Sequence, residues 1–261
     1  MAFNLASIRR GVQIAPPRII IYGTHGVGKT SFGAGADSPI LLPFEEGEGL
    51  IDIPRFPLIG SYADLMGAIG SLVSEQHDFK TAIIDTIDWM EPVVLAETCR
   101  TGGWKSIEDP GFGKGWQAAD GTWREVLGGF DALRERGMQV IVLAHSEIKN
   151  YADPATDNYD RHQLKLQKRA WGILQEWADV VGFLSFRTVI EKSASGFGKQ
   201  VAKGKGFGER VLYLEERPAY YAKNRYRLPP EIKMPQDDPS GMYKAFAAAL
   251  NQSVAQAAKE Q

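Results

Sequence analysis

An apolar run leads directly into a glycine-rich turn in the sequence Ile19-Ile20-Ile21-Tyr22-Gly23-Thr24-His25-Gly26-Val27-Gly28-Lys29-Thr30. From Gly23 onward it matches GxxxxGK[ST], the phosphate-binding P-loop between a strand and a helix. The glycines let backbone N–H groups turn toward phosphate oxygens, Lys29 offers positive charge to the β- and γ-phosphates, and the Thr30 hydroxyl can bind Mg²⁺. The expected nucleotide-binding residues are Gly23, Thr24, His25, Gly26, Val27, Gly28, Lys29, Thr30 and Ser31.

The composition indicates a folded protein with a sizeable core. The chain has 261 residues, of which 44% are hydrophobic and 24% are charged, which is enough to bury a large core. Its single cysteine, Cys99, cannot form an internal disulfide, and we find no N-terminal apolar leader or membrane-length apolar run. We therefore expect a cytoplasmic protein without a membrane partner. The net charge of −2 does not by itself indicate nucleic acid, although basic residues concentrate in the last third of the chain.

Strand-like apolar runs recur along the chain, separated by segments long enough for crossover helices. They are residues 19–22, 39–44, 81–85, 139–144 and 180–186. This alternation predicts an α/β fold with a mostly parallel central sheet flanked by helices. Short β-prone pieces at 187–191 and 211–214 flank a Gly/Lys stretch at 195–208, which predicts antiparallel hairpins with a mobile loop near the C-terminal end. We expect a lead-in at 1–17, a core at 18–230 and a tail with a helix at 231–261.

Polar side chains follow three of the predicted strands. Ligands of open α/β sheets bind at the carboxyl ends of the strands, where Asp85 matches a Walker B carboxylate that could hold Mg²⁺ together with Thr30. Asp88 is a less favoured substitute. ATP and Mg²⁺ are the expected cofactors.

Two further strand ends carry candidate catalytic groups. Glu45 and Glu46 follow the run at 39–44, and either could position the water that attacks the γ-phosphate. We favour Glu46, although a solvated acidic turn remains an alternative interpretation. His145 follows the run at 139–144, as a γ-phosphate sensor would, and a histidine with only a packing role fits the pattern about equally well.

The order of these motifs resembles the RecA-like branch of P-loop ATPases. More narrowly, four short segments resemble phage nucleotide-binding proteins of the Sak-type single-strand annealing group, across about residues 18–228. They are Glu46-Gly47, Gly113-Lys114-Gly115-Trp116, Ala144-His145 and Ala222-Lys223-Asn224-Arg225-Tyr226. The resemblance implies a RecA-like core that binds single-stranded DNA and promotes annealing or recombination with ATP.

The same resemblance implies a homo-oligomer, either a ring or a filament. In such assemblies a basic finger reaches the γ-phosphate held by a neighbouring subunit and stabilises the transition state. Arg225 would be that finger and Lys223 its partner. A solvated basic turn before Pro229-Pro230 is the alternative interpretation.

Two segments lie where RecA-like proteins hold DNA, at 102–120 and 146–169. Both are expected to be loops. The first mixes glycine, aromatic and basic residues, and the second carries aromatic and basic residues, as single-strand-binding surfaces do. The candidate DNA-binding residues are Lys105, Lys114, Trp116, Lys149, Arg161, Lys165, Lys168 and Arg169. The Gly/Lys stretch at 195–208 would add backbone contacts or form only a flexible hairpin. Whether a single-strand-binding protein docks on the alanine-rich tail stays open.

The leading hypothesis is an ATPase whose hydrolysis is coupled to binding of single-stranded DNA. A small-molecule or nucleotide kinase is a second hypothesis, because a P-loop and a Walker B carboxylate also serve phosphoryl transfer. No arginine-rich lid segment is evident in the sequence, which weighs against it. A third hypothesis is a loader or regulator that uses ATP as a switch without hydrolysing it.

Overall fold

The computed structural model describes residues 15–47, 51–154, 157–195 and 199–259. Most of the predicted lead-in, residues 1–14, lies outside the described part, as do residues 196–198 near the start of the predicted mobile loop at 195–208. The strands are β1 (Arg18–Gly23), β2 (Pro39–Pro43), β3 (Thr81–Asp85), β4 (Gln139–Tyr151), β5 (Tyr159–Leu164), β6 (Val180–Ser195), β7 (Lys199–Tyr213), β8 (Lys223–Asn224) and β9 (Glu231–Lys233). The helices are α1 (Lys29–Ala34), α2 (Tyr62–Ser74), α3 (Ile87–Gly102), α4 (Lys114–Glu135), α5 (Lys168–Trp177) and α6 (Gly241–Lys259). The prediction of a loop is wrong for residues 199–208, which belong to a long strand, β7, paired with β6.

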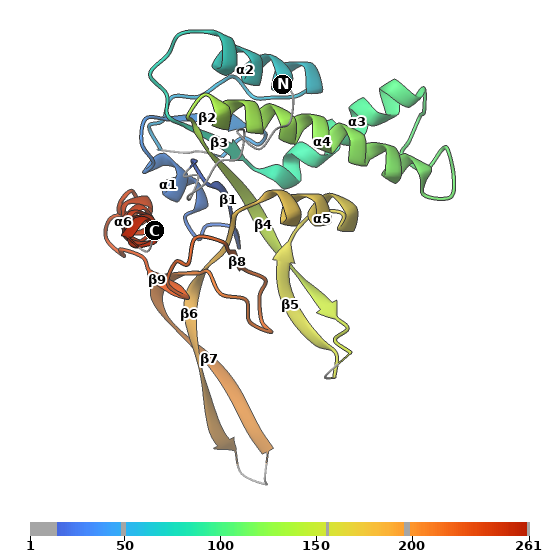
Figure 1. The fold of residues 1–261 in the computed structure, drawn as a ribbon. Coiled ribbons are helices and arrows are strands. Elements are labelled where there is room, and N and C mark those ends of the chain that lie inside the picture. Colours follow the sequence, from blue (N-terminus) through green and yellow to red (C-terminus); the bar gives the residue numbers. More distant parts are fainter. Residues whose placement is uncertain (1–14, 48–50, 155–156, 196–198, 260–261) are drawn as a thin grey trace.

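The central sheet has the order β2-β3-β4-β1-β6-β7-β9 (Figure 1). The first five strands in this order are parallel, whereas β7 and β9 are antiparallel to their neighbours. The predicted fold class, a mostly parallel sheet with antiparallel hairpins near the C-terminal end, is therefore confirmed. Strand β4 lies between β1 and β3, with Gly23 opposite His145 in the register. The end of β4 thus lies between the P-loop and the end of β3.

Helices cover both faces of the sheet. Helices α2, α3, α4 and α5 pack on one face, around buried side chains such as Trp123 and Phe130. Helices α1 and α6 pack on the other, where Phe32, Met242 and Phe246 belong to one apolar cluster with the sheet (Figure 1). Residues 231–261, which we expected as a tail with a helix, thus contribute α6 to a core layer. No helix in the described ranges is both long and apolar enough to cross a bilayer.

Two further segments predicted as loops contain regular structure instead. Strand β4 continues past the sheet to Tyr151 and pairs with β5, so most of 146–169 is an antiparallel hairpin followed by the start of α5. In 102–120, helix α4 begins at Lys114, directly after Gly113 in the left-handed conformation (φ 70°). Gly115 is buried in its first turn, where a Cβ would lie 1.9 Å from the Ile107 carbonyl oxygen. Gly113 and Gly115, which favour a loop in the sequence, therefore mark the start of a helix and a close backbone contact.

Candidate nucleotide-binding site

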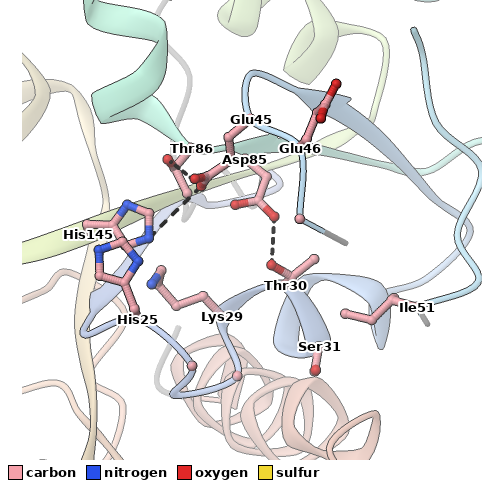
Figure 2. Close-up of a pocket in the computed structure, with 13 residues that line it drawn as sticks. His25, Lys29, Thr30, Ser31, Glu45, Glu46, Ile51, Asp85, Thr86 and His145 are labelled. Atoms are coloured by element: carbon pink, nitrogen blue, oxygen red, sulfur yellow. Dashed lines mark hydrogen bonds and ion pairs between the residues drawn. The ribbon is translucent and has the colours of Figure 1, made fainter. Parts of the chain in front are cut away.

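The P-loop joins β1 to α1 at the carboxyl edge of the sheet. Gly26 (φ 72°) and Gly28 (φ 102°) adopt conformations that other residues rarely take. Gly23 is equally constrained, because a Cβ there would lie 2.2 Å from the Leu184 carbonyl oxygen. The loop borders a cavity of about 430 Å³, within the range of small-ligand sites. Figure 2 shows the side chains that converge on this cavity.

Lys29 lies buried at the base of this cavity. Its Nζ donates hydrogen bonds to the carbonyl oxygens of Gly23 (3.2 Å) and Thr24 (3.1 Å), both within the P-loop. Burial lowers the pKa of Lys29, and the carboxylates of Asp85 and others nearby oppose that shift. Additional negative charge, such as that of a phosphate, would therefore stabilise the ammonium.

Thr30 and Asp85 form the direct contact expected of a Mg²⁺ site. The Thr30 hydroxyl donates a hydrogen bond of 2.7 Å to Asp85 Oδ2 (Figure 2). Burial raises the pKa of Asp85 to about 6; the Thr30 bond opposes the shift and the negative charge of Glu45 adds to it. A buried carboxylate with so little compensation is stabilised by a cation, and Mg²⁺ commonly takes one or two carboxylates together with phosphate oxygens. The donor set therefore fits Mg²⁺, and Thr30 and Asp85 are the residues that would hold it.

Glu45, and not the favoured Glu46, makes the contacts inside the site. Thr86 donates a hydrogen bond of 3.0 Å to Glu45 Oε1, and His145 Nε2 lies 4.0 Å from the same oxygen. Glu46 borders the cavity as an exposed residue, and its carboxylate is turned away from Thr30 (Figure 2). Both residues follow the end of β2 at Pro43, in a bend where the regular alternation of a strand no longer fixes which side chain points inward. The geometry makes Glu45 the better candidate for positioning water.

His145 is held by Asp88, which the sequence suggested only as a metal ligand. Asp88 Oδ2 lies 2.9 Å from His145 Nδ1, and Asp88 Oδ1 accepts the His145 backbone N–H at 2.9 Å. The His145 ring stacks on that of His25, with ring centroids 3.7 Å apart. Because His25 belongs to the P-loop, this stack joins the loop to the end of β4.

Lys223 and Arg225 lie at the opposite, amino edge of the sheet. Strand β8 pairs with the first residues of β6, far from the P-loop. Arg225 forms an ion pair with Asp179 (3.4 Å), and Lys223 Nζ donates to the carbonyl oxygens of Gln175 and Glu176 (3.4 Å to the latter) at the end of α5. Within one subunit these cations therefore do not contact the nucleotide site.

The candidate DNA-binding residues fall into two groups. Arg161 does not fit the prediction, because its side chain is 5% exposed, pairs with Glu216 (2.5 Å) and lies over the rings of Tyr151 and Tyr221. Arg169 pairs with Asp120, and Trp116 donates to Glu108 at 2.6 Å. The exposed lysines, some of which also make local contacts, are Lys105, Lys114, Lys149, Lys165 and Lys168.

Sequence analysis missed two contacts that hold the P-loop. The first is the stack of His25 on His145. The second comes from Arg210 on β7, whose Nε donates a hydrogen bond of 3.1 Å to the Val27 carbonyl oxygen. No local pattern marks either contact, since the partners are far apart in the chain. For Asp88, its position three residues after the strand-end Asp85 was a usable signal, but it did not identify the partner.

The fold and site define a P-loop nucleotide-binding protein. A family model described as an AAA domain matches residues 15–226, and the chain belongs to this family, with a P-loop ATPase core. It is similar to the SPbeta prophage-derived uncharacterized protein YorG of Bacillus subtilis (strain 168), with 26% identity over 214 residues. That alignment covers 80% of this chain and 59% of the relative, so the chain spans about three fifths of the relative's length.

Proposed function

We propose that the protein hydrolyses ATP and uses the cycle to control binding of single-stranded DNA, as a phage recombination or annealing protein of the Sak type would. The observation that carries the ATPase part is the bond between Thr30 and Asp85 beside Lys29, with Glu45 and His145 on the facing wall. Lys29 binds phosphate and Glu45 orients the attacking water, while bound Mg²⁺ supplies charge neutralisation to the phosphates. The relative's prophage origin agrees with a phage role.

The DNA part of the proposal is supported by the hairpin formed by β4 and β5. This hairpin continues the strand that carries His145. A shift of His145 when the γ-phosphate is lost would therefore displace the first residues of the hairpin. It presents Lys149 and the 63%-exposed Ile148. The turn before α4 presents the fully exposed Phe112 near Lys114. Cations that follow a backbone and aromatic faces that stack on bases are the usual ingredients of single-strand binding.

The first test is Lys29→Ala. Loss of the phosphate-binding cation should lower ATP turnover by about a hundredfold or more, measured as phosphate release from purified protein. Lys80→Ala is the matched control, because Lys80 is an exposed lysine whose ion pair with Asp37 contributes little. Unchanged turnover in the Lys29 variant would contradict the ATPase assignment.

The second test measures ATP turnover and DNA binding together. Single-stranded DNA should stimulate turnover, and Lys149→Ala should weaken binding and reduce the salt dependence by about one phosphate contact. Lys80→Ala should leave both unchanged. Phosphate transfer to a small acceptor would instead indicate a kinase, and nucleotide binding without turnover would indicate a switch protein.

A further inference from the structure

Arg210 reaches the P-loop from a distant part of the chain. It lies on β7, and its Nε donates a hydrogen bond of 3.1 Å to the Val27 carbonyl oxygen, 183 positions away in the sequence. The same nitrogen lies 3.7 Å from the position that a Cβ on Gly28 would take. The Arg210 side chain therefore lies directly against the peptide that joins Val27 to Gly28.

Several contacts hold Arg210 in place. Its backbone N–H donates to Gln236 Oε1 at 3.1 Å, and its carbonyl oxygen accepts the Met234 N–H at 2.9 Å. Its guanidinium carbon lies 5.2 Å from the centre of the Phe186 ring, which belongs to the residue opposite Arg210 in the register of β6 and β7. A cation over an aromatic face is attracted to it. The position of the donor is therefore fixed by β6, β7 and the segment that follows β9.

The bond to Val27 also fixes the direction of the next N–H group. A peptide unit is planar, and in its trans form the C=O and N–H groups point in opposite directions. Because the Val27 carbonyl points to Arg210, the Gly28 N–H points to the other side of the peptide. Gly28 lines the nucleotide cavity together with Gly26 and Lys29. The side of this peptide that faces away from Arg210 is thus the side from which a phosphate would approach.

Without Arg210, the peptide before Gly28 could turn over. Gly28 has φ 102°, and glycine accepts positive and negative φ about equally, so neither orientation is sterically excluded. In the turned form the Val27 carbonyl oxygen would face the cavity and repel phosphate oxygens. Arg210 offers its hydrogen bond only to the form whose carbonyl faces away from the cavity. It therefore favours the phosphate-binding form before a ligand arrives, and such preorganisation lowers the cost of binding.

We propose that Arg210 is a positioning residue of the nucleotide site, which holds the Val27–Gly28 peptide so that the Gly28 N–H donates to a phosphate of the bound nucleotide. This inference rests on the proposed nucleotide site and does not require hydrolysis. Arg210 acts through the backbone of the P-loop, and the property that matters is its N–H donor and not its charge.

Two substitutions separate the donor from the charge. Arg210→Gln keeps a nitrogen donor at the same number of bonds from Cα as Nε but removes the charge, whereas Arg210→Met removes both and keeps a similar length. The measurement is calorimetric titration of the full chain with ADP and Mg²⁺. Arg210→Met should raise the Kd about tenfold, the effect of one lost hydrogen bond, and Arg210→Gln should stay within about threefold of wild type. A glutamine variant as weak as the methionine variant would overturn the inference.

Arg187→Met is the matched control. Arg187 lies on β6 directly after Phe186, and it forms ion pairs with Glu209 on β7 (2.8 Å) and Glu231 on β9 (2.7 Å). The substitution therefore removes the same charge at the base of the same hairpin and leaves the bond to Val27 intact. Its Kd for ADP should stay within about twofold of wild type, because surface ion pairs contribute little.

A spectroscopic measurement reports on the peptide itself. Val27-Gly28 and Val181-Gly182 are the two Val-Gly steps of the sequence. Protein labelled with ¹³C at valine carbonyls and ¹⁵N at glycine therefore gives signals from Gly28 and Gly182 alone when each amide is correlated with the preceding carbonyl, and Gly182 serves as the internal reference.

ADP with Mg²⁺ should shift the Gly28 amide proton downfield in wild type and in Arg210→Gln, and clearly less in Arg210→Met. The Gly182 signal should stay in place. Should Arg210→Met fail to fold, a Gly28 signal that does not respond to ADP in wild-type protein would still overturn the inference.

Two outcomes separate this inference from the proposed function. Wild-type protein that hydrolyses ATP, together with Arg210→Met protein that binds ADP as tightly as wild type, would overturn the inference and leave the ATPase proposal intact. Wild-type protein that never hydrolyses ATP, but whose affinity for ADP falls in Arg210→Met and returns in Arg210→Gln, would support the inference and contradict the ATPase proposal.

Discussion

Each edge of the sheet contains a buried aspartate, and the pKa values of the two carboxyl groups shift in opposite directions. At the carboxyl edge, Asp85 is 6% exposed and its pKa is raised to about 6. At the amino edge, Asp179 is 7% exposed, yet its pKa is lowered, because hydrogen bonds from Arg18 outweigh the effect of burial. Arg18 donates to both oxygens of Asp179, at 2.9 and 3.0 Å, through its guanidinium. Burial alone therefore does not make a site, and the supply of positive partners distinguishes a structural carboxylate from a ligand-binding one.

The largest effect is expected from Asp179→Ala at the amino edge. Removing this carboxylate leaves Arg18 without its bidentate partner and should lower the free energy of unfolding by about 3–5 kcal/mol, measured by urea denaturation. The lowered pKa of Asp179 means that its stabilisation is present above its unfolded-state pKa and is lost as the pH falls through the folded value. Asp78→Ala is the control. A loss below about 1 kcal/mol, the range of surface ion pairs, would erase the proposed contrast between the edges.

Asp85→Asn should have the opposite sign. The raised pKa of Asp85 means that its protonated form favours the fold, and this stabilisation is lost as the pH rises from 3.8 through about 6. Asparagine keeps the neutral form at every pH, so the variant should be more stable by about 3 kcal/mol at pH 7 and no more stable near pH 4.

Thermal unfolding at several pH values measures the effect of Asp85→Asn, and Asp78→Asn is its control. The same variant should lose Mg²⁺-dependent ATP turnover. A variant that is less stable than wild type at pH 7 would show that Asp85 is already compensated, as Asp179 is.

The smallest effect on stability is expected from Arg225→Ala. This side chain is 52% exposed and Arg18 continues to hold Asp179, so the loss should be about 0.5 kcal/mol. If Arg225 is the finger that acts on a neighbouring subunit, ATP turnover should nevertheless fall while nucleotide binding persists.

Mixing two inactive proteins sharpens this prediction. A mixture of Arg225→Ala and Lys29→Ala subunits can assemble sites that have an intact P-loop and an intact finger. Activity should therefore return in the mixture. Additive inactivity would place Arg225 with the structural cations of the amino edge.

Features that depend on local sequence were predictable. The P-loop, the strand that ends at Asp85 and the part of β4 that leads to His145 are each marked by residues of one short segment, and the apolar runs of these strands reflect burial in a parallel sheet. The fold class followed from their alternation with helical segments. The spacing of Val126, Phe130 and Leu133 is typical of an amphipathic helix, and all three are buried residues of α4.

Features that depend on distant contacts were not predictable. Asp88 and His145 are 57 positions apart, so their pairing appears only when β3 and β4 lie side by side. Arg161 read as a surface cation because Tyr221, which lies close beneath it, is distant in the chain. The β4–β5 hairpin was missed because it projects from the core and carries polar residues on both faces, which removes the usual alternation of a half-buried strand.

Strand β4 has a mechanical consequence, because it is unbroken from Gln139 to Tyr151. The last residue of the strand lies six positions after His145, a reach of about 20 Å at the usual rise. A one-residue slip against β5 would turn every side chain of the hairpin to the other face. A displacement of β4 near His145 would therefore tilt the β4–β5 hairpin as a rigid unit, and the end of the hairpin near Tyr151 would move furthest.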